Sequence, residues 1–139
     1  MVENQQVSLF NNQITAINSG VFTGLTALQT LILHSNLFTT INIGVFTGLT
    51  VLQALDLTYN QHIPAINSGV FTGLTALQTL YLQYNPTSQF EVGAFAGLQF
   101  PMPGLTGLLS DMFMRFTAPT SIITALSDRL TTYITPRQQ

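Results

Sequence analysis

The residues of this chain best suited to do chemistry are a serine, a histidine and an aspartate, at Ser8, His34 and Asp56. They are the three types of a hydrolytic triad, in which the histidine takes the serine proton and the aspartate orients the imidazole. The chain has no cysteine, which excludes a disulfide framework and a thiolate metal site. Whether Ser8, His34 and Asp56 can act together depends on the elements that carry them.

Those elements belong to an internal repeat. The sixteen residues 16–31, AINSGVFTGLTALQTL, return unchanged at 65–80. A frame L-x-x-L-x-L-x-x-N recurs along the chain, and it ends on asparagines spaced by 24, 24 and 25 residues: Asn12, Asn36, Asn60 and Asn85. The longer step places one extra residue near His62. The fold and the function therefore depend on one repeat unit that recurs along the chain.

The second half of each copy carries the pattern G-[VA]-F-x-G-L, preceded by an apolar residue shortly after the asparagine. Its phenylalanines are Phe22, Phe46, Phe71 and Phe95. With this two-part pattern, residues 4–98 resemble the leucine-rich repeat family, specifically the 24-residue type of extracellular and cell-surface proteins. The resemblance implies a receptor or adhesion role at the cell surface for the parent protein. The chain departs from such relatives because it lacks the cysteine-bonded caps that usually close their ends.

The fold class we expect is an α/β repeat solenoid, a curved horseshoe segment with a short parallel β-sheet on its concave face. Alternation such as Leu31-Ile32-Leu33 has period two, so the leucines point inward and the isoleucine points outward. Since strands recur only after long connections, neighbouring strands must run parallel. Stacked copies bury leucines on one side and phenylalanines on the other. The four asparagines are expected to be buried at the corner after each strand, where their amides satisfy backbone groups.

The solenoid is predicted to span residues 1–98, about four copies of which the first is truncated, and residues 99–139 lie outside the pattern. Apolar residues at helical spacing between Ser121 and Pro136 predict a C-terminal helix near 121–134. Three interpretations of this segment stay open: a cap over the last repeat, an amphipathic helix for a partner or membrane surface, and a segment foreign to the repeat fold. The second is disfavoured because the polar face lacks basic residues.

The low content of charged residues excludes one class of function, nucleic-acid binding by the repeats. Only 6% of the residues are charged, against a usual quarter or so. There is no lysine, and all three arginines follow the repeats, at Arg115, Arg129 and Arg137. The repeats therefore lack the basic surface that a nucleic-acid backbone requires.

No membrane span is expected, because the most apolar stretch of the tail, Leu105–Phe116, is broken by charges and is shorter than the roughly 20 residues required. We also expect no metal and no cofactor. No signal peptide is visible at the start, so the localisation stays open.

Candidate binding residues come from the outward positions of adjacent strands, a surface we call the sheet face. They are Ser8, Phe10, Ile32, His34, Asp56, Thr58, Tyr81 and Gln83. Ser8, His34 and Asp56 fall on three neighbouring strands, but an open sheet offers no oxyanion donors and no pocket that excludes water. We therefore predict no enzyme, and expect His34 and Asp56 to form a diagonal polar pair.

These features predict a non-catalytic module for protein–protein recognition that binds another protein through the concave sheet, as part of a longer leucine-rich repeat receptor or adhesion protein. The mixture of apolar, aromatic and polar groups on the sheet face is one that interfaces favour at their centres. The alternative is a self-associating scaffold without a dedicated ligand, assembled through the open strand edge at Val7–Leu9. An enzyme would require a catalytic domain elsewhere in a longer parent.

Overall fold

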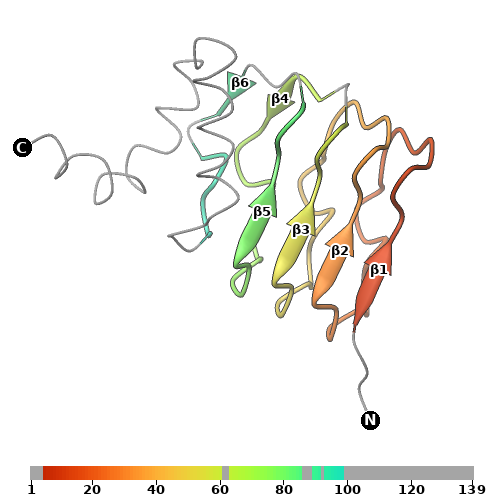
Figure 1. Cartoon of the computed structure of the whole chain (residues 1–139). Coiled ribbons are helices and arrows are strands. Elements are labelled where there is room, and N and C mark those ends of the chain that lie inside the picture. Colours follow the sequence, from red (N-terminus) through yellow and green to blue (C-terminus); the bar gives the residue numbers. More distant parts are fainter. Residues whose placement is uncertain (1–4, 61–62, 86–88, 92, 99–139) are drawn as a thin grey trace, which may run out of the picture.

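The computed structural model describes residues 5–60, 63–85, 89–91 and 93–98, which form a stack of similar coils (Figure 1). We number the coils 1 to 4 by their asparagines, Asn12, Asn36, Asn60 and Asn85. Each coil contributes one three-residue strand to the main sheet: β1 (Gln6–Ser8), β2 (Thr30–Ile32), β3 (Ala54–Asp56) and β5 (Thr79–Tyr81). All neighbours pair in parallel, in the order β1-β2-β3-β5. The predicted parallel sheet of short strands is confirmed.

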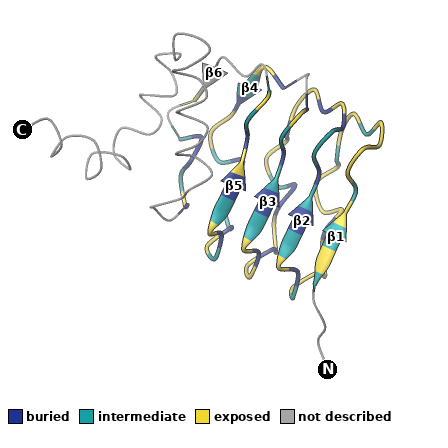
Figure 2. Ribbon diagram, in the orientation of Figure 1, coloured by how far each residue is buried: buried dark blue, intermediate teal, exposed yellow. Residues whose placement is uncertain are grey.

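The register of the main sheet follows the alignment of the copies. Ser8 lies opposite Ile32, Ile32 opposite Asp56, and Asp56 opposite Tyr81. The central residues of β2, β3 and β5 are buried leucines, whereas the central Val7 of β1 is only partly buried (Figure 2). Outward side chains of equivalent positions therefore form continuous rows across the coils.

A second, two-stranded parallel sheet was not foreseen from the sequence. It pairs β4 (Ala65–Ile66) with β6 (Gln89–Phe90), which lie beyond the asparagine corner of coils 3 and 4. Coils 3 and 4 are offset by 25 residues at β3–β5 and by 24 at β4–β6. The extra residue therefore lies between Asn60 and Ala65, where the sequence placed it.

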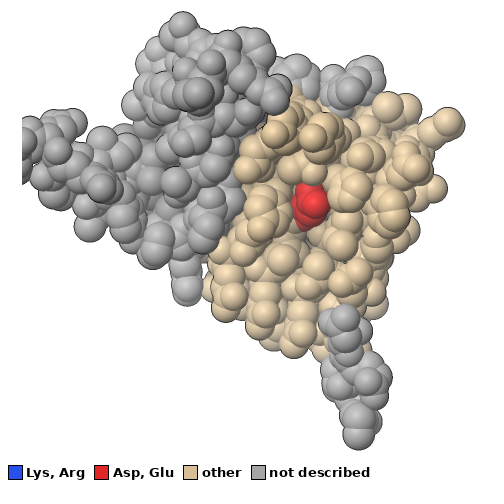
Figure 3. All heavy atoms as spheres, viewed as in Figure 1, with Lys and Arg blue, Asp and Glu red and all other residues tan. Residues whose placement is uncertain are grey.

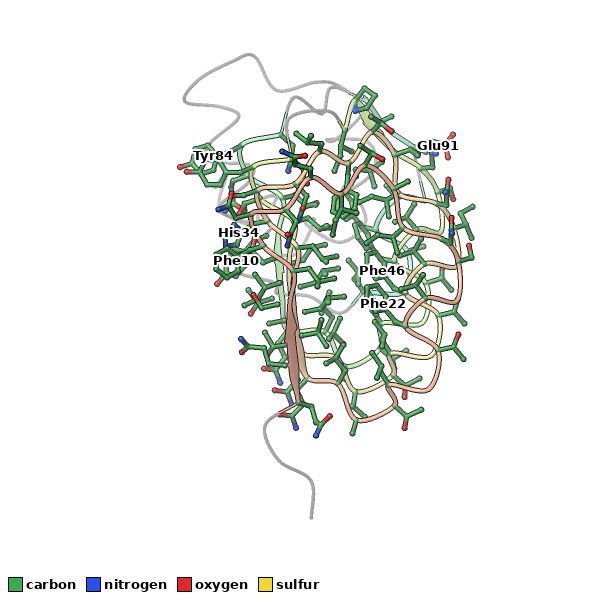
Figure 4. The ribbon with its side chains drawn as sticks, turned by 90° about the vertical axis from the view of Figure 1, so that its right-hand side faces the viewer. Phe10, Phe22, His34, Phe46, Tyr84 and Glu91 are labelled. Carbon is green, nitrogen blue, oxygen red and sulfur yellow. The ribbon has the colours of Figure 1, made fainter. Side chains whose placement is uncertain are left out.

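The core lies between the main sheet and a column of phenylalanines. Leu31, Leu55 and Leu80 are fully buried on the sheet side. Opposite them, the rings of Phe46 and Phe71 stack with centroids 6.2 Å apart, as do those of Phe71 and Phe95. Figure 4 shows Phe22 and Phe46 pointing into the stack. Each copy thus buries one apolar layer, and the core is continuous only because the layers are stacked.

No helix is present among the residues that the structure describes. The connections are turns closed by backbone hydrogen bonds, for example from Thr23 N to Gly20 O and from Leu25 N to Phe22 O. Gly20 and Gly24 hold positive φ angles of 86° and 93°, which interrupt any helical path. The α component of the predicted α/β class is therefore absent from this part of the chain, and the predicted helix at 121–134 lies outside it.

Over the same described residues, no helix of the length and apolarity needed to cross a membrane is found.

The corner after each strand is held by an asparagine ladder. The Asn60 side-chain amide donates to the carbonyl oxygens of Leu33, Leu57 and Thr58 at 3.0–3.2 Å. Its Oδ1 accepts from the backbone amide of Asn36, at 3.2 Å. Asn36 Oδ1 accepts in turn from Asn12 N, and Asn85 Oδ1 from Asn60 N. The ladder pairs backbone groups that the turning chain would otherwise leave unpaired.

The expectation that all four asparagines are buried is wrong for Asn12 and Asn85. Asn36 and Asn60 are buried, but Asn85 is half-buried and Asn12 is exposed. Its amide still donates to the carbonyl oxygens of Leu9 and Phe10. The difference arises because Asn12 belongs to coil 1, at one end of the described stack, and so has a described coil on only one side of it.

Replacing Asn60 with alanine should lower the free energy of unfolding by about 3 kcal/mol, because buried carbonyl groups lose their donor. Asn12→Ala is the matched control, and it should cost much less since water can replace the exposed amide. Chemical denaturation monitored by circular dichroism measures both. Equal losses for the two variants would contradict a role for the buried ladder.

Candidate recognition surface

The sheet face combines exposed and half-buried side chains from all four coils. Ser8, Phe10 and Tyr81 are exposed, and the others are half-buried: Ile32, His34, Asp56, Thr58 and Gln83. The ladder of backbone hydrogen bonds continues past the strands, from Ser35 N to Thr58 O and from Tyr59 N to Gln83 O. The row of Phe10, His34, Thr58 and Gln83 therefore stays in line with the row of Ser8, Ile32, Asp56 and Tyr81.

The serine, histidine and aspartate are brought onto one face but do not form a triad. His34 Nδ1 lies 2.9 Å from Ser35 Oγ, and the His34 ring stacks on Phe10 with centroids 5.1 Å apart. Asp56 accepts hydrogen bonds from Thr58, two residues further along its own coil. Within the described residues, neither His34 nor Asp56 bonds to Ser8, so nothing there activates the serine hydroxyl.

The predicted diagonal pair of His34 and Asp56 is also wrong, since no hydrogen bond or ion pair joins them in the described part of the chain. Both side chains have nearer partners. Asp56 Oδ1 accepts from Thr58 N at 3.0 Å and from Thr58 Oγ1 at 2.7 Å, while the imidazole is held by Ser35 and Phe10. The imidazole and the carboxylate are therefore each held by partners other than the other.

Two tyrosines that the sequence reasoning missed extend the surface beyond the sheet face. Tyr59 and Tyr84 are 48% and 40% exposed, and their rings stack with centroids 4.5 Å apart and planes 10° apart. Figure 4 shows Tyr84 on the same side of the molecule as His34 and Phe10. The signal was present as the dipeptide Tyr-Asn, which ends the frame in two consecutive copies.

The backbone at these tyrosines is left-handed. Tyr59 and Tyr84 have φ angles of 57° and 62°, and the equivalent Asn11 and Ser35 have 59° and 60°. Asparagine adopts this conformation readily, but bulky residues do so only when the surroundings impose it. The turn before each ladder asparagine imposes it here, and so aims the two tyrosine rings outward and against each other.

Among the described residues, the acidic groups on the side of the main sheet are confined to one place. Figure 3 shows a single group of acidic atoms over the strands, and Asp56 is the acidic residue of the four strands of the main sheet. The second described carboxylate, Glu91, accepts from Ser68 N at 2.6 Å and lies on the side away from His34 and Phe10 (Figure 4). The described sheet face is thus largely uncharged and carries one carboxylate, that of Asp56, near its centre.

A cavity in the interior, lined mainly by residues of coil 2, is too small for a small-molecule ligand. That cavity has a volume of about 10 Å³, enough for at most about one water. Its lining is mainly apolar: Ile17, Leu33, Phe38, Thr40, Ile41, Val45, Phe46 and Leu57. Nor do the described residues bring together three histidine, aspartate or glutamate side chains that could hold a metal ion. Binding chemistry in this part of the chain is therefore a property of its surface.

Comparison with known proteins agrees with the repeat pattern. Residues 5–62 match the leucine rich repeat family model, whose members are generally non-catalytic. No curated protein sequence gives a match.

Among solved structures, the chain is similar to human 5T4 (Wnt-activated inhibitory factor 1, trophoblast glycoprotein), with a TM-score of 0.64 and 22% sequence identity. The match covers 87% of this chain and 44% of that one, so the chain spans less than half of its length. At this identity the likeness establishes the fold.

A double-mutant cycle of Tyr59→Ala and Tyr84→Ala should give a coupling energy of about 1 kcal/mol in the free energy of unfolding, because stacked aromatic pairs contribute beyond their burial. The same cycle with Tyr59 and Phe10, which lie two coils apart, should give none. Denaturant titration of the single and double variants supplies the energies. Additive losses for Tyr59 and Tyr84 would show that the two rings do not support each other.

Proposed function

Because residues 5–62 belong to the leucine-rich repeat family, we propose that this chain is a non-catalytic protein-recognition module whose sheet face binds another protein. The observation that carries the proposal is the composition of that face. Phe10 and Tyr81 are 50% and 41% exposed and lie among serine, threonine, histidine and glutamine. Aromatic groups surrounded by uncharged polar groups are typical of interface centres.

The fixed register of the strands that carry the sheet face supports recognition. Its side chains stand on strands whose register is fixed by parallel pairing across four coils. A surface that is ordered before binding loses less conformational freedom when a partner docks. The bonds of His34 and Asp56 to their neighbours hold these side chains in place but supply no acid–base pair.

The size of the sheet face supports a place within a longer array. Four strands about 4.8 Å apart present roughly a few hundred Å², below the ~800 Å² per partner of a standard interface. We propose that the parent protein is a longer leucine-rich repeat receptor or adhesion protein, in which neighbouring coils enlarge the surface. The fraction of the human 5T4 chain that is matched, 44%, is compatible with such a section.

Self-association is a second candidate function, favoured by the edge of the main sheet. β1 is the first strand in the sheet order, and the apolar residues of coil 1 are only partly buried: Val7, Leu9, Ile14 and Ile17. An edge strand of this kind is a template for another chain. The described residues include only two carboxylates and no lysine or arginine, so little repulsion opposes assembly.

Recognition can be tested with a phage-displayed library of short random peptides selected on the immobilised chain. Peptides that bind should lose affinity about tenfold for the double variant Phe10→Ala, Tyr81→Ala, because aromatic anchors carry most of the energy of an interface. Ile43→Ala is the matched control, since Ile43 is 64% exposed but lies outside the main sheet. Failure to enrich any peptide, or binding lost only in the control, would contradict the proposal.

Self-association predicts a molar mass that rises with protein concentration in light scattering after size exclusion. Ser8→Lys should return the chain to a monomer, because a charged side chain on an edge strand blocks pairing with a second copy. A mass that stays at one chain, 15.2 kDa, at every concentration would remove this candidate.

A further inference from the structure

We infer that the partner of the sheet face presents one positively charged side chain, a lysine or an arginine, to Asp56. This inference rests on the proposed function and names the chemistry of the partner. It commits to a protein side chain as the source of the positive charge. Four features of the described residues carry it: the orientation of the carboxylate, its lack of a partner charge, its position and its neighbours.

The Asp56 carboxylate is held in one orientation. Oδ1 accepts from both the backbone amide and the hydroxyl of Thr58, at 3.0 and 2.7 Å. These two bonds are the ones Asp56 makes within the described residues, and both use the same oxygen. The second oxygen is therefore available to a ligand. Because the side chain is already held in place, binding does not require it to lose further conformational freedom.

No positive charge balances Asp56 in the described part of the chain, which contains neither lysine nor arginine. Its carboxylate also lies at the centre of the sheet, on β3, with β2 on one side and β5 on the other. A half-buried carboxylate without a counter-charge favours a cationic partner, because complementary charge sets the specificity and register of an interface. Among the described residues of the sheet face, Asp56 is the one carboxylate that a cationic partner group can pair with.

The neighbours of Asp56 suit the stem and head of a long cationic side chain. Ile32 and Tyr81 lie directly opposite Asp56 in the register, on strands roughly 4.8 Å away. The isoleucine can cover the methylene stem, and the exposed tyrosine ring can take a cation on its face. A partner that docks over Asp56 would displace water from around the ion pair, which strengthens it.

The experiment uses the peptides selected from the phage library, synthesised and measured by isothermal titration. The expected result is one shared arginine or lysine in the selected peptides, and affinity about tenfold weaker for Asp56→Asn. Asparagine keeps an oxygen for the two Thr58 bonds, so the fold should be unchanged. A peptide with that basic residue replaced by glutamate should bind Asp56→Lys better than the wild-type chain.

Glu91→Gln is the matched control, because it removes the other described carboxylate, on the far side from the sheet face. It should leave peptide affinity unchanged. A further variant replaces the three arginines outside the described residues, Arg115, Arg129 and Arg137, with glutamine. That variant should bind the peptides as the wild-type chain does. An effect of Asp56→Asn that disappears in that variant would mean that Asp56 pairs with an arginine of its own chain and not with the peptide, and would overturn the inference.

Two other outcomes separate this inference from the proposed function. Peptides that lose affinity for Phe10→Ala, Tyr81→Ala but bind Asp56→Asn as well as the wild-type chain would overturn the cationic contact and leave sheet-face recognition standing. Peptides that bind every sheet-face variant equally would overturn both.

Discussion

The constraint on which the structure depends is the need to pair backbone carbonyl groups where the chain turns inside the stack. Each coil leaves its strand and bends at once, so the carbonyl groups at the corner cannot all join the sheet ladder. A buried asparagine meets this need in coils 2 and 3, where its amide donates to carbonyl groups of its own coil and the preceding one. Because Asn36 and Asn60 also accept from the backbone amide of the preceding ladder asparagine, the corner fixes the spacing of the coils as well as their shape.

The register between neighbouring coils aligns equivalent outward residues of the repeat into one continuous surface. Once the corners are locked, equivalent outward residues stand side by side, and the rows on the sheet face follow. The same repetition places Phe46, Phe71 and Phe95 in one column with equal separations of 6.2 Å. Core positions are therefore nearly identical between copies, while the outward positions differ from coil to coil. That division is what a recognition module requires, because the core can stay constant while the surface takes on specificity.

The sequence predicted the strands of the main sheet, their parallel order and the rows, because these depend on spacing alone, but it did not predict the second sheet of β4 and β6. It failed where side-chain geometry decides. The sequence places His34 and Asp56 in adjacent rows on neighbouring coils, which is compatible with a polar pair. In the structure, His34 instead bonds to Ser35 and Asp56 to Thr58, each within its own coil. The stacked tyrosines were missed because their alignment depends on a left-handed backbone at Tyr59 and Tyr84, which spacing does not reveal. The burial of Asn12 was overestimated because the repeat pattern treats an end coil like an inner one.

The most direct test of the central claim, that the sheet face is the recognition surface, is an isoleucine-methyl NMR titration of the wild-type chain with a selected peptide. Ile32 reports on the sheet face and Ile43 on an exposed position outside the main sheet, so one spectrum carries both the probe and its control. The account predicts that the Ile32 methyl resonance shifts on binding and that of Ile43 stays in place. A shift of Ile43 with Ile32 unchanged would contradict it.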